Sequence, residues 1–327
     1  MKVILFGCKD TTLHVAKFLR ELCDTVTLVT ISPDKGGEQE VAGYVDLAPY
    51  GSLFERIHIA QRYDLKCDDD LSFFKSVTCD LGIAVGWQRL IPPNILELFS
   101  VGVFGMHGSA QDLPFGRGRS PMNWSILEGR SWFYTNLFRY QAGVDDGPIL
   151  DTDCFSINDS DTAESLHYKN TLSLIKLLGN NWADFARGEI SLKQQKAGQG
   201  SYYPKRNPSD GLIDWADAIF NIERLIRAVG KPFYGAFSYL ESQEVRIYRA
   251  SLFYTDLETH QFKDRLYGEI CDVFPNGKFL VRCNGGVLLV HEFESTAKAL
   301  LPGQLLHSPE DGLRVFPRNR HGFFDCS

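Results

Sequence analysis

Long apolar runs are missing from this 327-residue chain. A transmembrane helix needs about 20 consecutive apolar residues, and no segment approaches that length. The first residues, MKVILFGCKD, contain an apolar stretch too short for a signal peptide, so we interpret them as a first β-strand. We therefore expect a cytoplasmic protein with no membrane partner.

Positive charge is also scarce. Lysine and arginine number 34 against 41 aspartates and glutamates, which gives a net charge of −7. Proteins that bind nucleic acid gain affinity by neutralising phosphates with basic side chains. An acidic chain has little of that affinity, so we expect a small-molecule substrate and no nucleic-acid partner.

Paired cysteines are absent too. The eight cysteines are irregularly spaced and none forms a Cys-x-x-Cys pair. This pattern excludes the usual zinc motifs and gives no sign of a disulfide framework in a chain of this length. We interpret the cysteines as reduced thiols of a cytosolic protein, and we predict no metal site.

A dinucleotide-binding glycine pattern is likewise missing. The expected first strand, residues 3–6, ends at Gly7 and is followed by GCKDTTLH. This segment lacks the Gly-x-Gly-x-x-Gly spacing that lets a backbone approach a pyrophosphate. The sequence therefore argues against a nicotinamide-dependent enzyme.

The first third of the chain does contain alternating strand and helix patterns. Apolar runs typical of buried strands cover residues 3–6, 25–31, 81–85 and 101–106. Strands separated by helical segments predict a parallel sheet with helices on both faces. Ligands of such sheets bind beyond the carboxyl ends of the strands, and Gly86, Trp87 and His107 lie at or just past such ends.

The rest of the chain changes character twice. Asp161-Thr-Ala-Glu164 predicts a capping box that opens a helix ending near Gly188, and a polar linker follows over residues 193–211. From about residue 235 short alternating strands, joined by glycine-rich turns, predict a small β-barrel. We therefore divide the chain into residues 1–190, a linker and helix over 191–234, and a β-rich module over 235–327.

One block carries most of the chemical information. Its motifs are His107-Gly108-Ser109, Pro114, Arg117-Gly118-Arg119-Ser120-Pro121 and, further on, Val144-Asp145-Asp146-Gly147. Together they resemble the pattern of the 10-formyltetrahydrofolate-dependent formyltransferases, a family that includes methionyl-tRNA formyltransferase and the sugar-nucleotide N-formyltransferases. The resemblance extends over residues 1–240. It implies a Rossmann-like catalytic domain followed by a helical linker and a small C-terminal β-barrel-like domain.

The residues themselves suit formyl transfer, in which an amine attacks a carbonyl carbon. A histidine can donate a proton or hydrogen bond at neutral pH, and His107 lies at a strand end in a glycine-rich loop. A nearby carboxylate can support the histidine and accept the proton of the amine. Asp145, flanked by Gly143 and Gly147, suits that task, and the register of the family motif favours it over Asp146.

One position departs from the family. Where the resemblance implies an asparagine that helps to hold the oxyanion, this sequence has Gly105. Losing an oxyanion donor typically costs about 100- to 1000-fold in rate. Three interpretations are open. Another donor replaces the missing asparagine, the protein is a weak catalyst, or the residue at this position has been altered. We expect that restoring asparagine beside Met106 and His107 raises turnover, because the rest of the family motif is intact around this one position. Turnover would fall instead if glycine is required by a positive φ angle or a close approach.

The resemblance also implies which residues contact the ligands. The folate contacts carry over to Arg89, Leu90, Ile91, Arg119, Gln141, Ala142, Gly143 and Val144. For Leu90 and Ile91 the alternative is plain core packing. A segment similar to that of sugar-modifying members offers Tyr202, Tyr203, Lys205 and Arg206 for ring stacking and a diphosphate clamp; the alternative is a solvated linker.

We therefore predict transfer of a formyl group from 10-formyltetrahydrofolate, a co-substrate, to the amine of a nucleotide-linked amino sugar. The segment SPDKGGEQEVAGYVD, residues 32–46, lacks the basic insertion of tRNA-specific members. The alternatives are methionyl-tRNA formylation, hydrolysis that passes the formyl group to water, and a folate or nucleotide-sugar binding protein without strong catalysis. The sequence allows a homodimer without requiring one.

Overall fold

The computed structural model describes residues 1–23, 25–39, 41, 43–196, 200–255, 261–313, 316–317 and 324. It contains two compact units. The first comprises Met1–Gly118, Trp132–Ser156 and His167–Tyr202, and the second comprises Arg119–Ser131, Ile157–Leu166 and Tyr203–Ser327. In the described part of the chain no helix has the length and apolarity of a membrane span. His260, His321 and Cys326 lie outside the described residues.

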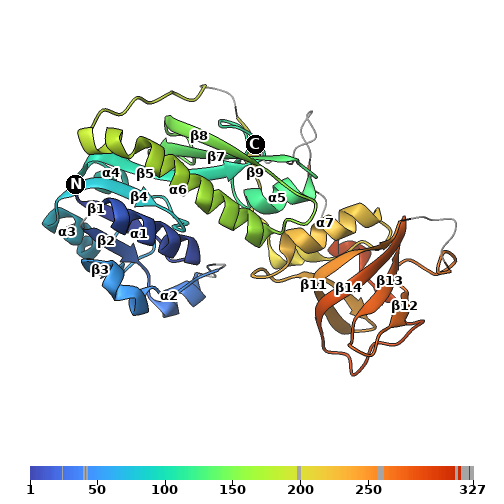
Figure 1. Cartoon of the computed structure of the whole chain (residues 1–327). Coiled ribbons are helices and arrows are strands. Elements are labelled where there is room, and N and C mark those ends of the chain that lie inside the picture. The colour runs from blue at the N-terminus through green and yellow to red at the C-terminus, as the bar shows by residue number, and fades with distance from the viewer. Residues whose placement is uncertain are drawn as a thin grey trace. The chain divides into compact units, whose positions relative to one another are not determined.

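The first unit is built on a seven-stranded sheet of order β3-β2-β1-β4-β5-β7-β8. Its strands are β1 (Val3–Phe6), β2 (Val26–Thr30), β3 (Arg56–Ile59), β4 (Cys79–Ala84), β5 (Phe99–Ser109), β7 (Trp132–Arg139) and β8 (Ile149–Ser156). The first five are mutually parallel, and β7 and β8 are antiparallel to their neighbours. The predicted Rossmann-like parallel sheet is confirmed, and an antiparallel edge extends it (Figure 1).

Helices cover both faces of this sheet, which explains its nearly continuous apolar strands. Val3 and Leu5 pack with α1 (Asp10–Leu22) and α6 (Ala163–Arg187), which lie on the same side of the sheet in Figure 1. Ile4 and Phe6 point to the opposite face and pack with α3 (Asp68–Ser76) and α4 (Pro93–Leu96). The alternation along β1 thus divides the core into two layers.

The start of α6 differs from the predicted capping box. Thr162 and Ser165 form the reciprocal pair, because the Thr162 N–H donates to Ser165 Oγ at 3.0 Å and the Ser165 N–H donates to Thr162 Oγ1 at 3.2 Å. The Asp161 carboxylate instead accepts from the Asn158 N–H at 2.7 Å and from Ser165 Oγ at 2.8 Å. The box is therefore shifted by one residue from the prediction, with serine in place of glutamate.

The second unit contains α5 (Pro121–Leu127), α7 (Ile219–Val229) and a six-stranded antiparallel sheet of order β12-β13-β14-β11-β10-β15. The strands are β10 (Ala236–Leu240), β11 (Gln243–Tyr254), β12 (Ile270–Val273), β13 (Phe279–Cys283), β14 (Gly286–Ser295) and β15 (Leu306–His307). The two edges meet, since the Leu306 N–H donates to Gly268 O at 2.9 Å and the Ile270 N–H donates to Gln304 O at 2.8 Å. The predicted β-barrel-like module is therefore confirmed.

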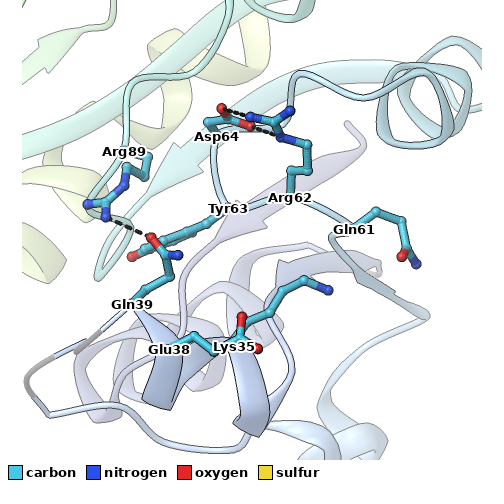
Figure 2. A pocket seen from close by; sticks show the side chains of 8 residues that line it. All are labelled: Lys35, Glu38, Gln39, Gln61, Arg62, Tyr63, Asp64 and Arg89. Atoms are coloured by element: carbon cyan, nitrogen blue, oxygen red, sulfur yellow. Dashed lines mark hydrogen bonds and ion pairs between the residues drawn. The ribbon is translucent and has the colours of Figure 1, made fainter.

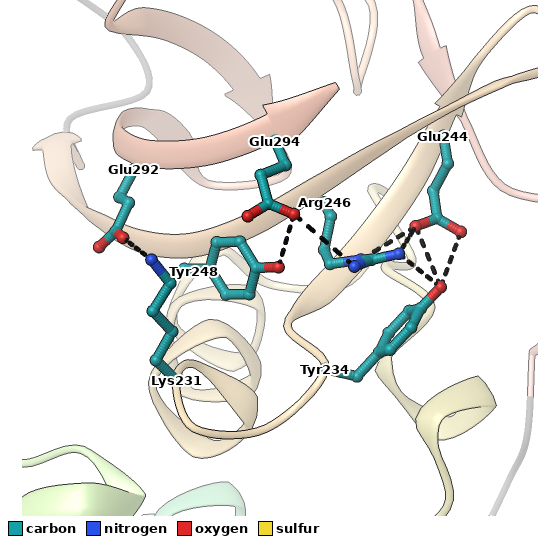
Figure 3. Close-up of polar contacts among 7 residues, drawn as sticks. All are labelled: Lys231, Tyr234, Glu244, Arg246, Tyr248, Glu292 and Glu294. Atoms are coloured by element: carbon teal, nitrogen blue, oxygen red, sulfur yellow. Dashed lines mark hydrogen bonds and ion pairs between the residues drawn. The ribbon is translucent and has the colours of Figure 1, made fainter. Parts of the chain in front are cut away.

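A polar cluster fastens the turn after α7 to this barrel (Figure 3). The Arg246 guanidinium lies 3.7 Å from the centroid of the Tyr234 ring and pairs with Glu244 at 2.6 Å. Lys231 pairs with Glu292 on β14. Each cation in the cluster has a carboxylate and an aromatic partner, so we interpret the cluster as structural.

The remaining short elements are α2 (Pro33–Glu38), β6 (Arg117–Gly118), β9 (Tyr202–Tyr203) and the 3₁₀ turns Ala48–Leu53, Pro208–Gly211 and Glu310–Gly312. Strands β6 and β9 pair with each other.

Buried Asp70 organises the turn after β3. Its carboxylate accepts from the backbone N–H groups of Gln61 and Arg62 at 2.9 and 3.0 Å, and it contacts His58 Nε2 at 2.9 Å and Cys67 Sγ at 3.0 Å. Burial alone would raise the pKa of this carboxyl, but the hydrogen bonds outweigh burial and lower it.

We predict that Asp70→Asn lowers the free energy of unfolding by about 1–3 kcal/mol, because an amide nitrogen would face a buried donor. Since the folded pKa is depressed, the stabilising effect of Asp70 is complete above its unfolded pKa near 4 and disappears as pH falls through the folded pKa. Urea unfolding as a function of pH measures both effects. Asp69→Asn, an exposed change in the same helix, is the control; equal losses in the two variants would contradict the prediction.

Candidate active site

His107 lies on β5 between two neighbouring strands. Gly105, two residues earlier, pairs with Ala84 on β4 and with Phe138 on β7, and His107 pairs with Asn136 on β7. Directly opposed residues of antiparallel strands point to the same face. The face that carries His107 therefore also carries positions 105, 136 and 138.

The His107 ring is held at both nitrogens. Nε2 lies 2.7 Å from the carbonyl oxygen of Gly116, and Nδ1 lies 3.3 Å from the Asp145 carboxylate. The His107 side chain is 7% exposed and that of Asp145 is 20% exposed. A carbonyl oxygen can only accept, so Nε2 carries a hydrogen. Any proton that His107 takes up or releases therefore passes through Nδ1, the nitrogen that faces Asp145.

The loop that carries Asp145 is fixed by backbone contacts. Asp145 has a φ of +49°, a left-handed conformation that aspartate tolerates better than most residues, and its carboxylate accepts from the Gly118 N–H at 3.0 Å. A Cβ on Gly147 would lie 1.7 Å from Arg139 O, so glycine is required there. Asp146 turns the other way, with its carboxylate beside Gly143. The acid that faces His107 is thus Asp145, as the motif register predicts.

Gln195 completes this support, although the sequence places it in a polar linker. Its amide donates to Asp145 O at 2.8 Å and to Gly147 O at 2.7 Å, and its oxygen accepts from Arg117 at 2.5 Å. Sequence reasoning missed Gln195, because a glutamine in a polar stretch has no spacing that identifies its partners.

Gly105 has no room for a side chain. A Cβ at this position would lie 2.4 Å from Cε1 and 2.7 Å from the hydroxyl oxygen of Tyr140. Gly105 is not among the residues with positive φ, so backbone strain does not explain the glycine. The expected space for an asparagine is therefore filled by a neighbouring ring. Tyr140 is a second residue that the motifs did not identify.

Two asparagines lie in this region of the sequence and differ in their environment. Asn123 donates to Ala228 O at 2.5 Å within the second unit, so its amide is already occupied. Asn136, opposite His107, is fully buried; its oxygen accepts from Thr152 at 2.8 Å, and its nitrogen has no partner among the described residues. An unpaired buried amide nitrogen is costly, which marks this face as a place where a ligand oxygen would fit.

The predicted folate residues lie on two exposed loops and one separate segment. Leu90 is 51% exposed, so core packing does not account for it, whereas Ile91 is buried in the core. Gln141, Ala142 and Val144 are exposed and Gly143 is half-buried in the loop after β7. Arg119 is exposed and belongs to the second unit.

Arg89 lines a cavity of about 240 Å³ together with residues of α2 and the turn after β3 (Figure 2). Its guanidinium lies 5.0 Å from the Tyr63 ring centroid and donates to Gln39 at 3.0 Å. The other lining residues are Lys35, Glu38, Gln61, Arg62 and Asp64. His107 and Asp145 do not line this cavity, which is therefore distinct from the His107 site.

The predicted sugar-nucleotide residues have different environments. Tyr203 is buried; its hydroxyl donates to Glu128 at 2.9 Å and its ring stacks on Trp124. Arg206 lies 4.7 Å from the Trp124 ring centroid and donates to Asp210 O at 2.6 Å. Tyr202 is half-buried and Lys205 is exposed. Within the described ranges no group of three or more histidine, cysteine, aspartate or glutamate side chains could hold a metal ion.

Two family models and several solved structures are similar to this chain. A model of the formyl transferase family matches residues 14–173, and a model of the formyl transferase C-terminal domain matches residues 205–308. Among solved structures, the N-formyltransferase from Helicobacter canadensis in complex with folinic acid and dTDP-3-aminofucose is 18% identical, with a TM-score of 0.61 over 90% of this chain and 100% of that one.

Two other similar structures are those of proteins with different names. HypX from Aquifex aeolicus in complex with tetrahydrofolic acid is 17% identical, with a TM-score of 0.64 over 91% of this chain; the chain spans 45% of the length of HypX. Methionyl-tRNA formyltransferase from Clostridium thermocellum is 21% identical, with a TM-score of 0.55 over 77% of this chain and 94% of that one. At these identities the likeness shows a shared fold.

We predict that Gly116→Ala destabilises the protein more than Gly188→Ala. Both glycines have a φ near +70°, where alanine costs about 1–2 kcal/mol. A Cβ on Gly116 would lie 2.1 Å from Ser109 Oγ, whereas a Cβ on Gly188 would have nothing within 4 Å. Urea unfolding of both variants measures the difference. Equal losses of stability would mean that the loop whose Gly116 carbonyl accepts from His107 can shift without cost to make room for the Cβ.

Proposed function

Because the chain belongs to the formyl transferase family, we propose that it transfers a formyl group from 10-formyltetrahydrofolate to the amine of a nucleotide-linked amino sugar. The observation that carries this proposal is the pair formed by Nδ1 of the buried His107 and the carboxylate of the half-buried Asp145, 3.3 Å apart. Such a pair can take a proton at one atom and return it from the other.

The folate would supply the formyl group and, once transfer is complete, a nitrogen that accepts a proton. The chain's own residues fit such a molecule. The loops over 89–91 and 141–144 offer accessible backbone, since Leu90, Gln141, Ala142 and Val144 are exposed. The partnerless Asn136 amide nitrogen lies opposite His107. Pterin rings carry several donors and acceptors, which backbone groups can satisfy.

The proposed reaction balances in protons. A bond forms between the amine nitrogen and the formyl carbon, and the bond from that carbon to the folate nitrogen breaks. Asp145 takes the proton that leaves the amine, and His107 returns one from Nδ1 to the folate nitrogen. A proton transfer from Asp145 to Nδ1, across their 3.3 Å contact, then resets the site.

The sugar acceptor is supported by charge and by the similar structures. The chain carries a net charge of −7, and the described residues between β2 and β3 form the short helix α2 and the 3₁₀ turn Ala48–Leu53. A tRNA substrate would require phosphate contacts that this composition does not favour. The similar protein from Helicobacter canadensis was solved with dTDP-3-aminofucose. For this ligand class we propose that Lys205 and Arg206 contact the diphosphate and that Tyr202 and Tyr203 shape the sugar-nucleotide site.

We expect His107→Asn and Asp145→Asn each to reduce formyl transfer by about 100-fold or more, because each removes one half of the proton exchange. Steady-state kinetics measure the loss, and a thermal melt shows that the fold is retained. The control is Asp146→Asn, since Asp146 is exposed and faces Gly143. Normal turnover by the His107 variant would contradict the assignment.

We expect dTDP-linked amino sugars to gain the mass of CO when incubated with the protein and 10-formyltetrahydrofolate. Charged initiator tRNA should remain unformylated under the same conditions, and binding of the sugar nucleotide should depend only modestly on salt. Mass spectrometry of both acceptors checks this. Efficient formylation of the tRNA would overturn the proposed acceptor while leaving formyl transfer in place.

A further inference from the structure

We propose that the phenolic hydroxyl of Tyr140 binds the formyl oxygen during transfer, in place of the side-chain amide that Gly105 lacks. This inference rests on the proposed function and adds a catalytic residue to it. When the amine attacks, negative charge develops on the formyl oxygen, and a fixed donor that meets this charge stabilises the transition state.

The Tyr140 ring occupies the space that a side chain at position 105 would need. Its hydroxyl oxygen lies 2.7 Å from the place of a Gly105 Cβ. In an asparagine the amide nitrogen stands only two bonds from Cβ, so the phenol presents a donor in the same region. Gly105 and His107 are alternate residues of β5 and share one face. The hydroxyl therefore lies on the side of the sheet that carries His107.

The ring is held in place by its own contacts. The Tyr140 N–H donates to Val103 O at 2.7 Å. The ring stacks on Phe138 with centroids 5.2 Å apart and packs against Leu113 and Ile149. A donor fixed in this way needs little rearrangement when charge develops, which is the property that oxyanion sites require.

The hydroxyl is available as a donor. It makes no hydrogen bond to any residue in the part of the chain that the structure describes. Burial, and then the negative charge of Asp145, raise the pKa of Tyr140 well above its usual range. The phenol therefore keeps its proton at neutral pH, as a hydrogen-bond donor must.

Asn136 is the competing donor. Its amide nitrogen is buried without a partner among the described residues, and it pairs with His107 across β5 and β7. We favour Tyr140 because its hydroxyl occupies the space beside position 105. The residue at that position is glycine, which is the one residue that leaves room for the Tyr140 ring. The two donors are separated by experiment.

The first test compares three variants of the full chain. Tyr140→Phe keeps the ring and should lower kcat for formyl transfer by about 100- to 1000-fold, with the melting temperature and the calorimetric affinity for folinic acid unchanged. Tyr134→Phe, a tyrosine on β7, the strand that ends just before Tyr140, is the matched control and should keep full activity. Asn136→Leu tests the competing donor directly, and its loss of kcat should be smaller than that of Tyr140→Phe. A fully active Tyr140→Phe variant overturns the inference, and a large loss confined to Asn136→Leu assigns the donor to Asn136 instead.

The second test moves the hydrogen-bond donor from position 140 to position 105. Gly105→Asn alone should lower the melting temperature and the activity, because its Cβ would meet the Tyr140 ring at 2.4 Å. Gly105→Asn combined with Tyr140→Ala removes that clash and should melt higher and turn over faster than either single variant. A double variant no better than both single variants counts against the exchange. A parent protein that formylates no amine would overturn the proposed function together with this inference, whereas an active parent with an equally active Tyr140→Phe variant would overturn this inference alone.

Discussion

The antiparallel pairing of β5 with β7 is the constraint on which the rest of the site depends. It places Gly105 opposite Phe138 and His107 opposite Asn136, and it leads directly into the loop that carries Tyr140 and Asp145. A shift of one residue in this register would turn His107 to the other face of the sheet. The helices on both faces bury that sheet and so fix the register.

Backbone groups rather than other side chains hold most of the site. The carbonyl of Gly116 sets the proton on His107, the N–H of Gly118 binds Asp145, and Gln195 ties the Asp145 loop through two carbonyls. The glycines of the motifs keep the chain close enough for these contacts: a Cβ on Gly116 or Gly147 would collide with its neighbour. The motif glycines therefore hold His107 and Asp145 in a fixed geometry, in which the two side chains can exchange a proton.

The side chain of Tyr140 explains why position 105 is a glycine. In the sequence it is a missing amide, and a missing oxyanion donor suggests a weak catalyst. In the folded chain it is the space that a tyrosine ring fills, and the ring brings a hydroxyl of its own. The volumes of the residues at positions 105 and 140 are coupled, because a Cβ at position 105 would need the space that the Tyr140 ring fills.

The sequence by itself determined the α/β class, the strands β1, β2, β4 and β5, the barrel-like second module and the His107 and Asp145 motifs, because periodicity and short motifs are local. The capping box of α6 was misplaced by one residue, since two acceptable caps stand side by side at Asp161 and Thr162. The antiparallel edge, the role of Gln195 and the filling of position 105 by Tyr140 were decided only by the tertiary structure. Gly105 and Tyr140 lie 35 positions apart, and Gln195 lies 50 and 48 positions from its two carbonyl acceptors. No local pattern records which distant side chain will take up a given space.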